Sequence, residues 1–111
     1  MGEDYDDSLC HYATGYAGVV TRFIESSVAE LRFSVSGCMQ YAALDRCRLY
    51  INGCLCSNRK SIQSYISVGD TVNFDAAKAH PRVGINFRIV TGWVGKMTRE
   101  ERIYANGLRD L

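Results

Sequence analysis

The sequence has little of what fibrous, low-complexity or membrane-spanning chains contain. Its 111 residues include one proline and ten glycines without a repeat period, which excludes collagen-like and low-complexity chains. A membrane-spanning helix needs about 20 apolar residues in a row. The longest uncharged, mostly apolar stretch, residues 10–21, is too short and has no basic segment before it. We therefore expect no signal peptide and no membrane association.

The composition is instead that of one soluble globular domain. Hydrophobic residues make up 47% of the chain and charged residues 23%, so the apolar surface is sufficient to offset the entropy lost on ordering. A chain of 111 residues has the length of one ordinary domain and is long enough to bury one core. A multidomain organisation is therefore not expected.

The charge is nearly balanced but unevenly placed. Thirteen basic residues against twelve acidic ones give a net charge of +1. Four acidic residues lie within the first seven positions, so residues 8–111 carry 13 basic against 8 acidic residues, or +5. Ten of the basic residues are arginine, which binds phosphate and stacks on planar groups better than lysine does. The distribution indicates a basic binding face, with ordinary solvated arginines as the alternative.

The five cysteines are not expected to form a disulfide framework, because their number is odd and no signal peptide is expected. No pair has the C-x2-C to C-x4-C spacing that structural zinc sites use. The two histidines, His11 and His80, lie in no recognisable nucleophile motif. We therefore expect buried, reduced thiols and no metal at the cysteines, which are Cys10, Cys38, Cys47, Cys54 and Cys56.

Strand signals dominate after the first residues. Val28 to Val35 alternates polar and apolar side chains, the period of a half-buried strand. The run before it is rich in β-branched residues, and the three-residue turn between them predicts a β-hairpin. Asn52-Gly53 is a strong turn signal at the end of another strand. In all, the sequence predicts strands at residues 15–24, 28–35, 47–51, 71–76 and 85–94.

Helical signals are few. Residues 61–66 are expected to form a helical turn that packs Ile62, Tyr65 and Ile66. Thr98 and Glu101 have the spacing of a capping box and predict a helix that runs to about Ala105. Residues 36–46 have no clear period and are expected to be a loop or a short helical turn, and residues 79–84 a loop.

Five short strands separated by turns predict a small closed barrel, because closure removes exposed strand edges. The fold class we expect is all-β, a five-stranded OB-like barrel with a C-terminal helix, and an SH3-like barrel is the alternative. The expected division is an acidic flexible arm at residues 1–14, the barrel at 15–96 and the helix at 97–111.

Two segments carry a resemblance to a known family. Gly-Val-Val-Thr-Arg-Phe at residues 18–23 resembles the first strand of cold-shock-type OB domains, and Val-Gly-Asp-Thr-Val-Asn-Phe at residues 68–74 resembles their turn and fourth strand. Both are most similar to the divergent S1-like branch, which occurs as modules of larger eukaryotic RNA-regulatory proteins. The resemblance covers about residues 16–95 and implies binding of single strands by base stacking.

The sequence departs from the family where bases would stack. Arg22 occupies the tryptophan position of the first strand, and Ala29 and Leu31 stand where the second strand carries aromatic residues. The third strand keeps Tyr50, followed by Asn52 where the family often has histidine. Each base–aromatic stack is worth about 1–3 kcal/mol. The resemblance therefore implies a weak binder, with Arg22 beside Tyr50 as a reduced stacking platform.

Our first hypothesis is a non-enzymatic module that binds single-stranded nucleic acid, RNA rather than DNA, weakly or with help from a partner. Strands 2 and 3 and the flanking loops form the ligand face of OB barrels. The residues expected to bind are Arg22, Arg32, Arg48, Tyr50, Asn52, Arg59 and Lys60.

The second hypothesis is a degenerate OB domain used for protein–protein interaction within a larger assembly, since aromatic residues and arginine are enriched at interfaces. A homodimer through Met97, Ile103, Tyr104 and Leu108 of the C-terminal helix is a further alternative. The chain has no phosphate-binding glycine loop or catalytic cluster, so we expect no enzyme activity and no cofactor. Reduced thiols predict an intracellular protein, nuclear or cytoplasmic.

Overall fold

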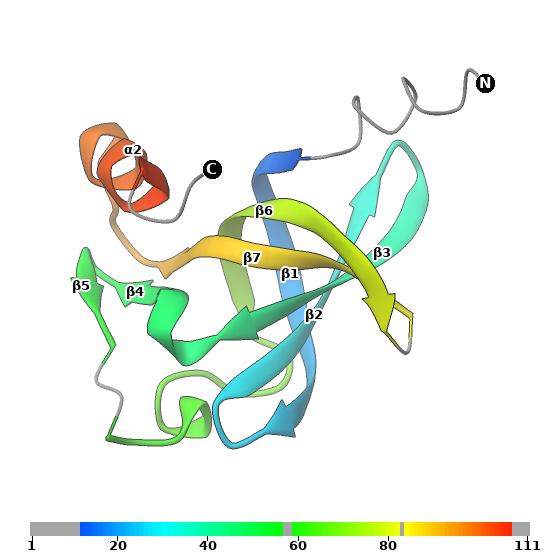
Figure 1. Ribbon diagram of the computed structural model, residues 1–111. Coiled ribbons are helices and arrows are strands. Elements are labelled where there is room, and N and C mark those ends of the chain that lie inside the picture. Colours follow the sequence, from blue (N-terminus) through cyan, green and yellow to red (C-terminus); the bar gives the residue numbers. More distant parts are fainter. Residues whose placement is uncertain (1–11, 57–58, 83, 108–111) are drawn as a thin grey trace.

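A computed structural model describes residues 12–56, 59–82 and 84–107 of the chain. Seven strands, two short 3-10 helices (η) and one α-helix follow one another within these residues (Figure 1). Their bounds are β1 Tyr12–Glu25, β2 Val28–Val35, β3 Cys38–Asp45, η1 Arg46–Arg48, β4 Leu49–Ile51, β5 Cys54–Leu55, η2 Ile62–Ser64, β6 Thr71–Arg82, β7 Ile85–Val94 and α2 Arg99–Gly107.

The five longest strands form a closed barrel. Their order is β3-β2-β1-β6-β7, and each neighbouring pair is antiparallel. A parallel pairing of β3 with β7, through Ala42 with Phe87 and Ala43 with Arg88, closes the sheet. This arrangement confirms the predicted all-β, five-stranded OB-like barrel with a C-terminal helix (Figure 1).

The barrel is filled by the apolar side chains of alternate strand positions. On β2, Leu31 and Phe33 are buried while Arg32 between them is exposed, as the period of two predicts. Phe33 meets Phe74 and Phe87 edge-on, with ring centroids 4.9 and 5.4 Å apart. The geometry is that preferred by aromatic pairs, so these rings give the core a defined packing.

The segment between β5 and β6 closes one end of the barrel. Ile62 of η2 and the following Ile66 are both buried, and the Ile62 N–H donates to the Ser26 carbonyl in the β1–β2 turn at 2.8 Å. The predicted helical turn at residues 61–66 is therefore confirmed as a cap on the core.

Helix α2 begins with the predicted capping box. The Glu101 N–H donates to Thr98 Oγ1 at 3.1 Å, and the Thr98 N–H donates to Glu101 Oε1 at 2.7 Å. Two backbone donors at the helix start are thus satisfied by two side chains.

A fully buried carboxylate, that of Asp75 on β6, holds α2 against the barrel. Arg102 donates to both of its oxygens, from Nε at 2.6 Å and from Nη2 at 2.5 Å, and Asn106 adds a bond of 2.9 Å. The Gly15 N–H of β1 donates to Asp75 Oδ1 at 2.8 Å. The hydrogen bonds to Asp75 outweigh partial burial and raise the pKa of Arg102. The helix is therefore fixed by a shared network that includes an ion pair.

The prediction for the third strand was wrong. The third barrel strand is β3, which lies within the segment expected to be a loop or helical turn, and residues 47–51 instead divide between η1 and the short β4. Ser36 and Gly37 both adopt positive φ, 51° and 82°, and this two-residue turn folds β3 back onto β2. β4 pairs with β7 outside the closed barrel and with β5 across the predicted Asn52-Gly53 turn.

Two expected boundaries also moved. β1 begins at Tyr12, so the last three residues of the expected arm belong to the strand, while residues 1–11 lie outside the described residues. β6 continues to Arg82 and pairs there with Ile85, so most of the loop expected at residues 79–84 is strand.

The expectation of buried thiols was wrong for three cysteines. Cys38, Cys47 and Cys54 are exposed, whereas Cys56 is buried, which raises its pKa, and Cys10 lies outside the described residues. Cys38 and Cys54 each begin a strand next to a turn, where the backbone leaves the core. Among the described residues, the structure contains no helix with the length and hydrophobicity of a membrane span.

Candidate nucleic-acid interface

The outer surface of β1, β2, β3, η1 and β7 brings together four arginines from separate parts of the sequence. Across the strands, Arg22 lies opposite Glu30, Glu30 opposite Ala43, and Ala43 opposite Arg88. We call this surface the basic face and define it by Arg22, Glu30, Arg32, Tyr41, Asp45, Arg48 and Arg88.

Glu30 is the more buried of the two acidic groups on the basic face. Thr21 Oγ1 donates to its Oε1 at 2.6 Å, and Arg22 Nη2 lies 3.2 Å from its Oε2. Burial raises the pKa of this carboxyl group, but the hydrogen bonds from Thr21 and Arg22 outweigh it and the pKa lies below its ordinary value. Arg22 is therefore engaged in an internal ion pair, which leaves less of its charge for a ligand.

Arg32 and Tyr41 form a cross-strand pair on β2 and β3. Arg32 is exposed and Tyr41 half-buried, and within the described residues neither side chain has a hydrogen-bond or ion-pair partner. Directly opposed side chains in an antiparallel sheet lie about 5 Å apart at Cβ. The pair thus offers a planar guanidinium and an aromatic ring side by side, both of which can stack on a base.

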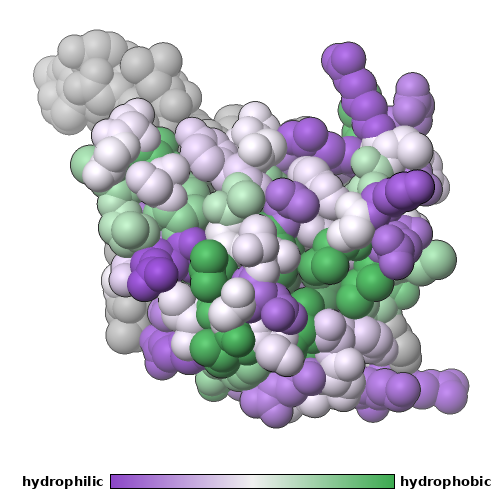
Figure 2. All heavy atoms as spheres, turned by 180° about the vertical axis from the view of Figure 1, so that it is seen from behind, coloured by the Kyte–Doolittle hydropathy of each residue, from purple (hydrophilic) through white to green (hydrophobic). Residues whose placement is uncertain are grey.

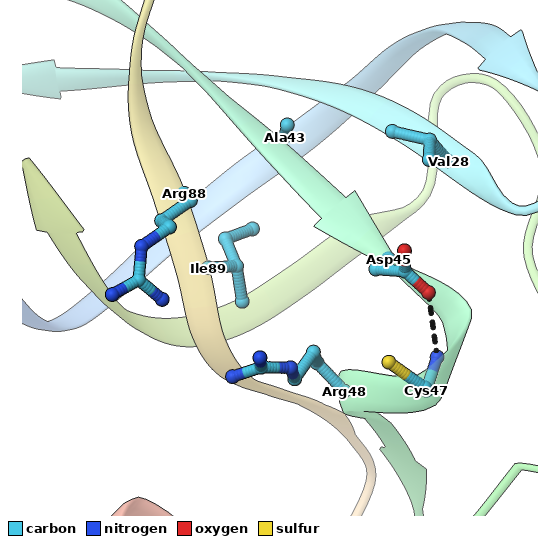
Figure 3. A pocket seen from close by; sticks show the side chains of 7 residues that line it. All are labelled: Val28, Ala43, Asp45, Cys47, Arg48, Arg88 and Ile89. Atoms are coloured by element: carbon cyan, nitrogen blue, oxygen red, sulfur yellow. Dashed lines mark hydrogen bonds between the residues drawn. The ribbon is translucent and has the colours of Figure 1, made fainter. Parts of the chain in front are cut away.

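A shallow hollow of about 270 Å³ lies where β3, η1 and β7 meet. Its apolar lining comes from Val28, Ala43 and Ile89. The guanidinium groups of Arg48 and Arg88 extend from η1 and β7 along the same side of the hollow (Figure 3). Nη1 of Arg48 is buried and has no hydrogen-bond partner within the described chain. A buried donor without an acceptor is costly, so this atom is the least satisfied polar group of the face.

The second acidic group of the face, Asp45, is also used within the fold. It precedes η1, and its Oδ1 accepts the Cys47 N–H at 3.1 Å (Figure 3). With Glu30 and Asp45 both bonded internally, the four guanidinium groups leave the basic face with a net positive charge.

The structure does not gather all the predicted site residues at one place. Arg22, Arg32 and Arg48 belong to the basic face, but Tyr50 is paired with Trp93 through β4 and β7. The expected platform of Arg22 beside Tyr50 is wrong, because β1 and β4 are separated by β6 and β7 in the sheet.

The remaining predicted residues lie beyond β4 and η1. Asn52 occupies the β4–β5 turn with a φ of 50°, and its Oδ1 accepts the Lys96 N–H at 3.1 Å. Arg59 and Lys60 are exposed in the segment after β5. The Lys60 carbonyl accepts a bond from Arg46 Nη1 at 2.8 Å, which ties this segment to η1, the helix that also carries Arg48.

The sequence reasoning missed Tyr41 and Arg88. Tyr41 lay in the segment without a clear period, whereas Arg88, a lone charge between Phe87 and Ile89, carried a usable signal for an outward position. The second-strand positions that the resemblance assigned to stacking, Ala29 and Leu31, lie fully buried in the core. The outward residues next to them are Glu30 and Arg32.

A larger hollow of about 520 Å³ lies between α2 and the barrel. Its polar groups serve the helix contact: Asp75 binds Arg102, and Arg102 lies over the Trp93 ring at 4.8 Å from the centroid. We therefore regard it as part of the joint between α2 and the barrel.

No protein-family model matches this chain, and no curated protein matches its sequence.

Proposed function

We propose that the protein is a non-enzymatic module that binds single-stranded nucleic acid weakly on the basic face, RNA in preference to DNA. OB barrels bind oligonucleotides on the surface of their second and third strands. The observation that carries the proposal is that Arg32 of the second strand shares the basic face with Arg48 and Arg88, and that none of the three has an ion pair in the described part of the chain. The preference for RNA rests on the resemblance to S1-like modules.

The chemistry of the face suits a sequence-tolerant ligand. Guanidinium groups bind phosphate oxygens through two parallel hydrogen bonds, and each phosphate contact makes affinity depend on salt. Arg32 and Tyr41 provide stacking surfaces, but fewer than an aromatic platform does, and each stack is worth about 1–3 kcal/mol. Affinity is therefore expected to be weak for an isolated domain.

Fluorescence anisotropy with a labelled mixed-sequence RNA tests the proposal. We expect binding at low salt that weakens as salt rises, and a marked loss of affinity in the double variant Arg32→Gln, Arg88→Gln. The double variant Lys96→Gln, Arg99→Gln, which removes two exposed charges at and just before α2, is the charge-matched control and should change affinity little. Absence of binding at low salt to both RNA and DNA would refute the proposal.

The alternative is a protein-interaction module, and the exposed residues of α2 favour it. Ile103 and Tyr104 are adjacent on this helix and are 59% and 71% exposed. On the face opposite that of Figure 1, however, hydrophobic side chains form separate groups among polar ones (Figure 2). That face therefore lacks the continuous apolar patch that marks many protein interfaces. If a self-association or partner-binding assay responds to Ile103→Ser with Tyr104→Ser while no strand binds, the alternative replaces the first proposal.

A reducing compartment, nuclear or cytoplasmic, suits either function. Three of the four cysteines in the described residues are exposed to solvent. Such thiols persist where glutathione and thioredoxin keep them reduced.

A further inference from the structure

We propose that the hollow between Arg48 and Arg88 is a phosphate-binding subsite that takes a backbone phosphodiester of the bound strand. The choice of a strand as the source of the phosphate rests on the proposed function, whereas the binding of a phosphate group does not. The subsite is distinct from the Arg32–Tyr41 pair, which offers surfaces for bases.

The first argument is an unmet hydrogen-bonding requirement. Nη1 of Arg48 is buried, yet it finds no acceptor within the described residues. Buried polar groups in native proteins are almost always paired, and a charged donor without an acceptor is among the most costly exceptions. A small turn of the Arg48 side chain toward the hollow would let an oxyanion there supply the missing acceptor.

The second argument is the meeting of two like charges. Arg88 reaches the hollow from β7, and Arg48 reaches it from η1 (Figure 3). Neither has an ion-pair partner in the described chain, so the two cations raise each other's electrostatic energy. A phosphate group between them offsets this repulsion, and its oxygens match the planar forks of guanidinium groups.

The third argument is size and lining. A volume of about 270 Å³ lies just below the range usual for small-molecule sites, which begins at about 300 Å³. The hollow therefore suits a phosphate with its attached sugar better than a whole dinucleotide. The half-buried side chains of Val28 and Ala43 provide an apolar surface for the carbon face of a sugar, and Ile89 behind them is buried in the core.

The acidic group at the hollow provides a variant that acts in the opposite direction. Asp45 lines the hollow and uses one carboxylate oxygen to cap η1. Asp45→Asn keeps an oxygen for the cap but removes a negative charge beside the phosphate. We expect this variant to bind phosphate and strand more tightly than the wild-type protein.

Titration with inorganic phosphate tests the subsite without any strand. We monitor the arginine Nε–Hε resonances by NMR, with sodium chloride at matched ionic strength as the control. Saturable shifts of the Arg48 and Arg88 signals are expected, with an affinity about tenfold lower in Arg88→Gln and in Arg48→Gln. Arg99→Gln should retain the wild-type affinity. Shifts no larger than those with chloride would overturn the subsite.

Titration with an RNA that carries hydroxyl groups at both ends tests the source of the phosphate, since it contains phosphodiesters only. Arg88→Gln should lower the salt slope of binding by about 1. Arg88 is exposed, so its variant remains informative even if Arg48→Gln fails to fold. If inorganic phosphate binds and RNA does not, the subsite stands and strand binding is refuted. If RNA binds with an unchanged slope in Arg88→Gln, the assignment of a phosphodiester to this hollow is wrong.

Discussion

At the scale of single residues, the buried carboxylate of Asp75 connects three elements of the fold. It is fully buried and is bound by Arg102, Asn106 and the Gly15 N–H, so it joins β6, α2 and β1. No local pattern predicts this role, because the partners of Asp75 are 27, 31 and 60 residues away along the chain.

We expect Asp75→Ala to lower the free energy of unfolding by about 3–5 kcal/mol, because it leaves Arg102 partly buried without its counter-charge. Urea unfolding followed by fluorescence measures the change. Asp70→Ala is the matched control. It removes an exposed carboxylate whose one hydrogen bond within the described residues comes from the Ser67 N–H in a turn, so it should cost about 1 kcal/mol. Equal losses in the two variants would show that the Asp75 network does not hold the helix.

Glu30 makes the free energy of unfolding depend on pH. Its pKa is lowered in the folded protein, despite burial, by hydrogen bonds from Thr21 and Arg22. A carboxyl group with a lowered folded pKa contributes stability above its unfolded pKa, close to the ordinary value of 4.5, and loses it as the pH falls through the folded pKa. We therefore expect unfolding free energy to decline below about pH 4.5 more steeply in the wild-type protein than in Glu30→Gln.

Urea titrations at several values between pH 7 and pH 3 check this expectation. Glu25→Gln, which alters an exposed carboxyl group near the end of β1, is the control and should follow the wild-type curve. Parallel curves for the wild-type protein and Glu30→Gln would contradict the role assigned to Glu30.

At the scale of elements, two-residue turns decide which strands pair. Ser36-Gly37 and Asn52-Gly53 both place two consecutive residues at positive φ, the geometry that matches the twist of a hairpin. The Asn-Gly turn was recognisable from sequence, whereas a Ser-Gly turn is a weaker signal. This difference explains why the β4–β5 turn was predicted and the β2–β3 hairpin was missed.

We expect Gly37→Ala to lower the unfolding free energy by about 1–2 kcal/mol, because its φ of 82° disfavours a side chain while nothing lies within 4 Å of the added Cβ. The cost is thus one of backbone conformation alone.

Gly107→Ala is the opposite case. This residue lies in α2 with open space around it and no positive φ, so alanine should raise the free energy of unfolding by about 0.4–1 kcal/mol. Thermal unfolding measures both changes: the melting temperature should fall in Gly37→Ala and rise in Gly107→Ala. A lower melting temperature in Gly107→Ala as well would contradict this reasoning.

Elements with strong local signals were predictable, and those defined by tertiary pairing were not. β2 and β7 were predicted at their observed bounds, and α2 was predicted from its cap, because alternation and capping are local properties. β3 alternates only weakly, with Ala42 and Ala43 in succession. It forms a strand because it pairs with β2 on one side and β7 on the other, and its own sequence does not predict this pairing.

The same division applies to the candidate site. Arg22, Arg32 and Arg48 were expected from their place near early strands. Arg88 was not expected, because it lies near Arg48 only after β3 pairs with β7 in parallel. The spacing of residues in the sequence does not predict this pairing. Tyr50 was assigned to the site because the strand that carries it was taken for the third barrel strand.

At the scale of the whole molecule, the near-neutral net charge conceals two opposing parts. The first seven residues contain four acidic groups, and residues 8–111 carry a net charge of +5. Acidic groups on the same chain reduce the positive potential that attracts a phosphate backbone, and this effect fades as salt shortens the distance over which charges interact. The segment thus competes with the ligand wherever it lies within reach of the basic face.

We expect the fourfold variant Glu3→Gln, Asp4→Asn, Asp6→Asn, Asp7→Asn, whose net charge is +5, to bind RNA more tightly than the wild-type protein at low salt. The two affinities should converge as the salt concentration rises, because screening removes the difference that the four charges make. Anisotropy titrations over a range of salt concentrations measure this, with Glu100→Gln, which removes one charge from α2, as a control. A gain in affinity that persists unchanged at high salt would mean that the segment acts through direct contacts and not through its charge.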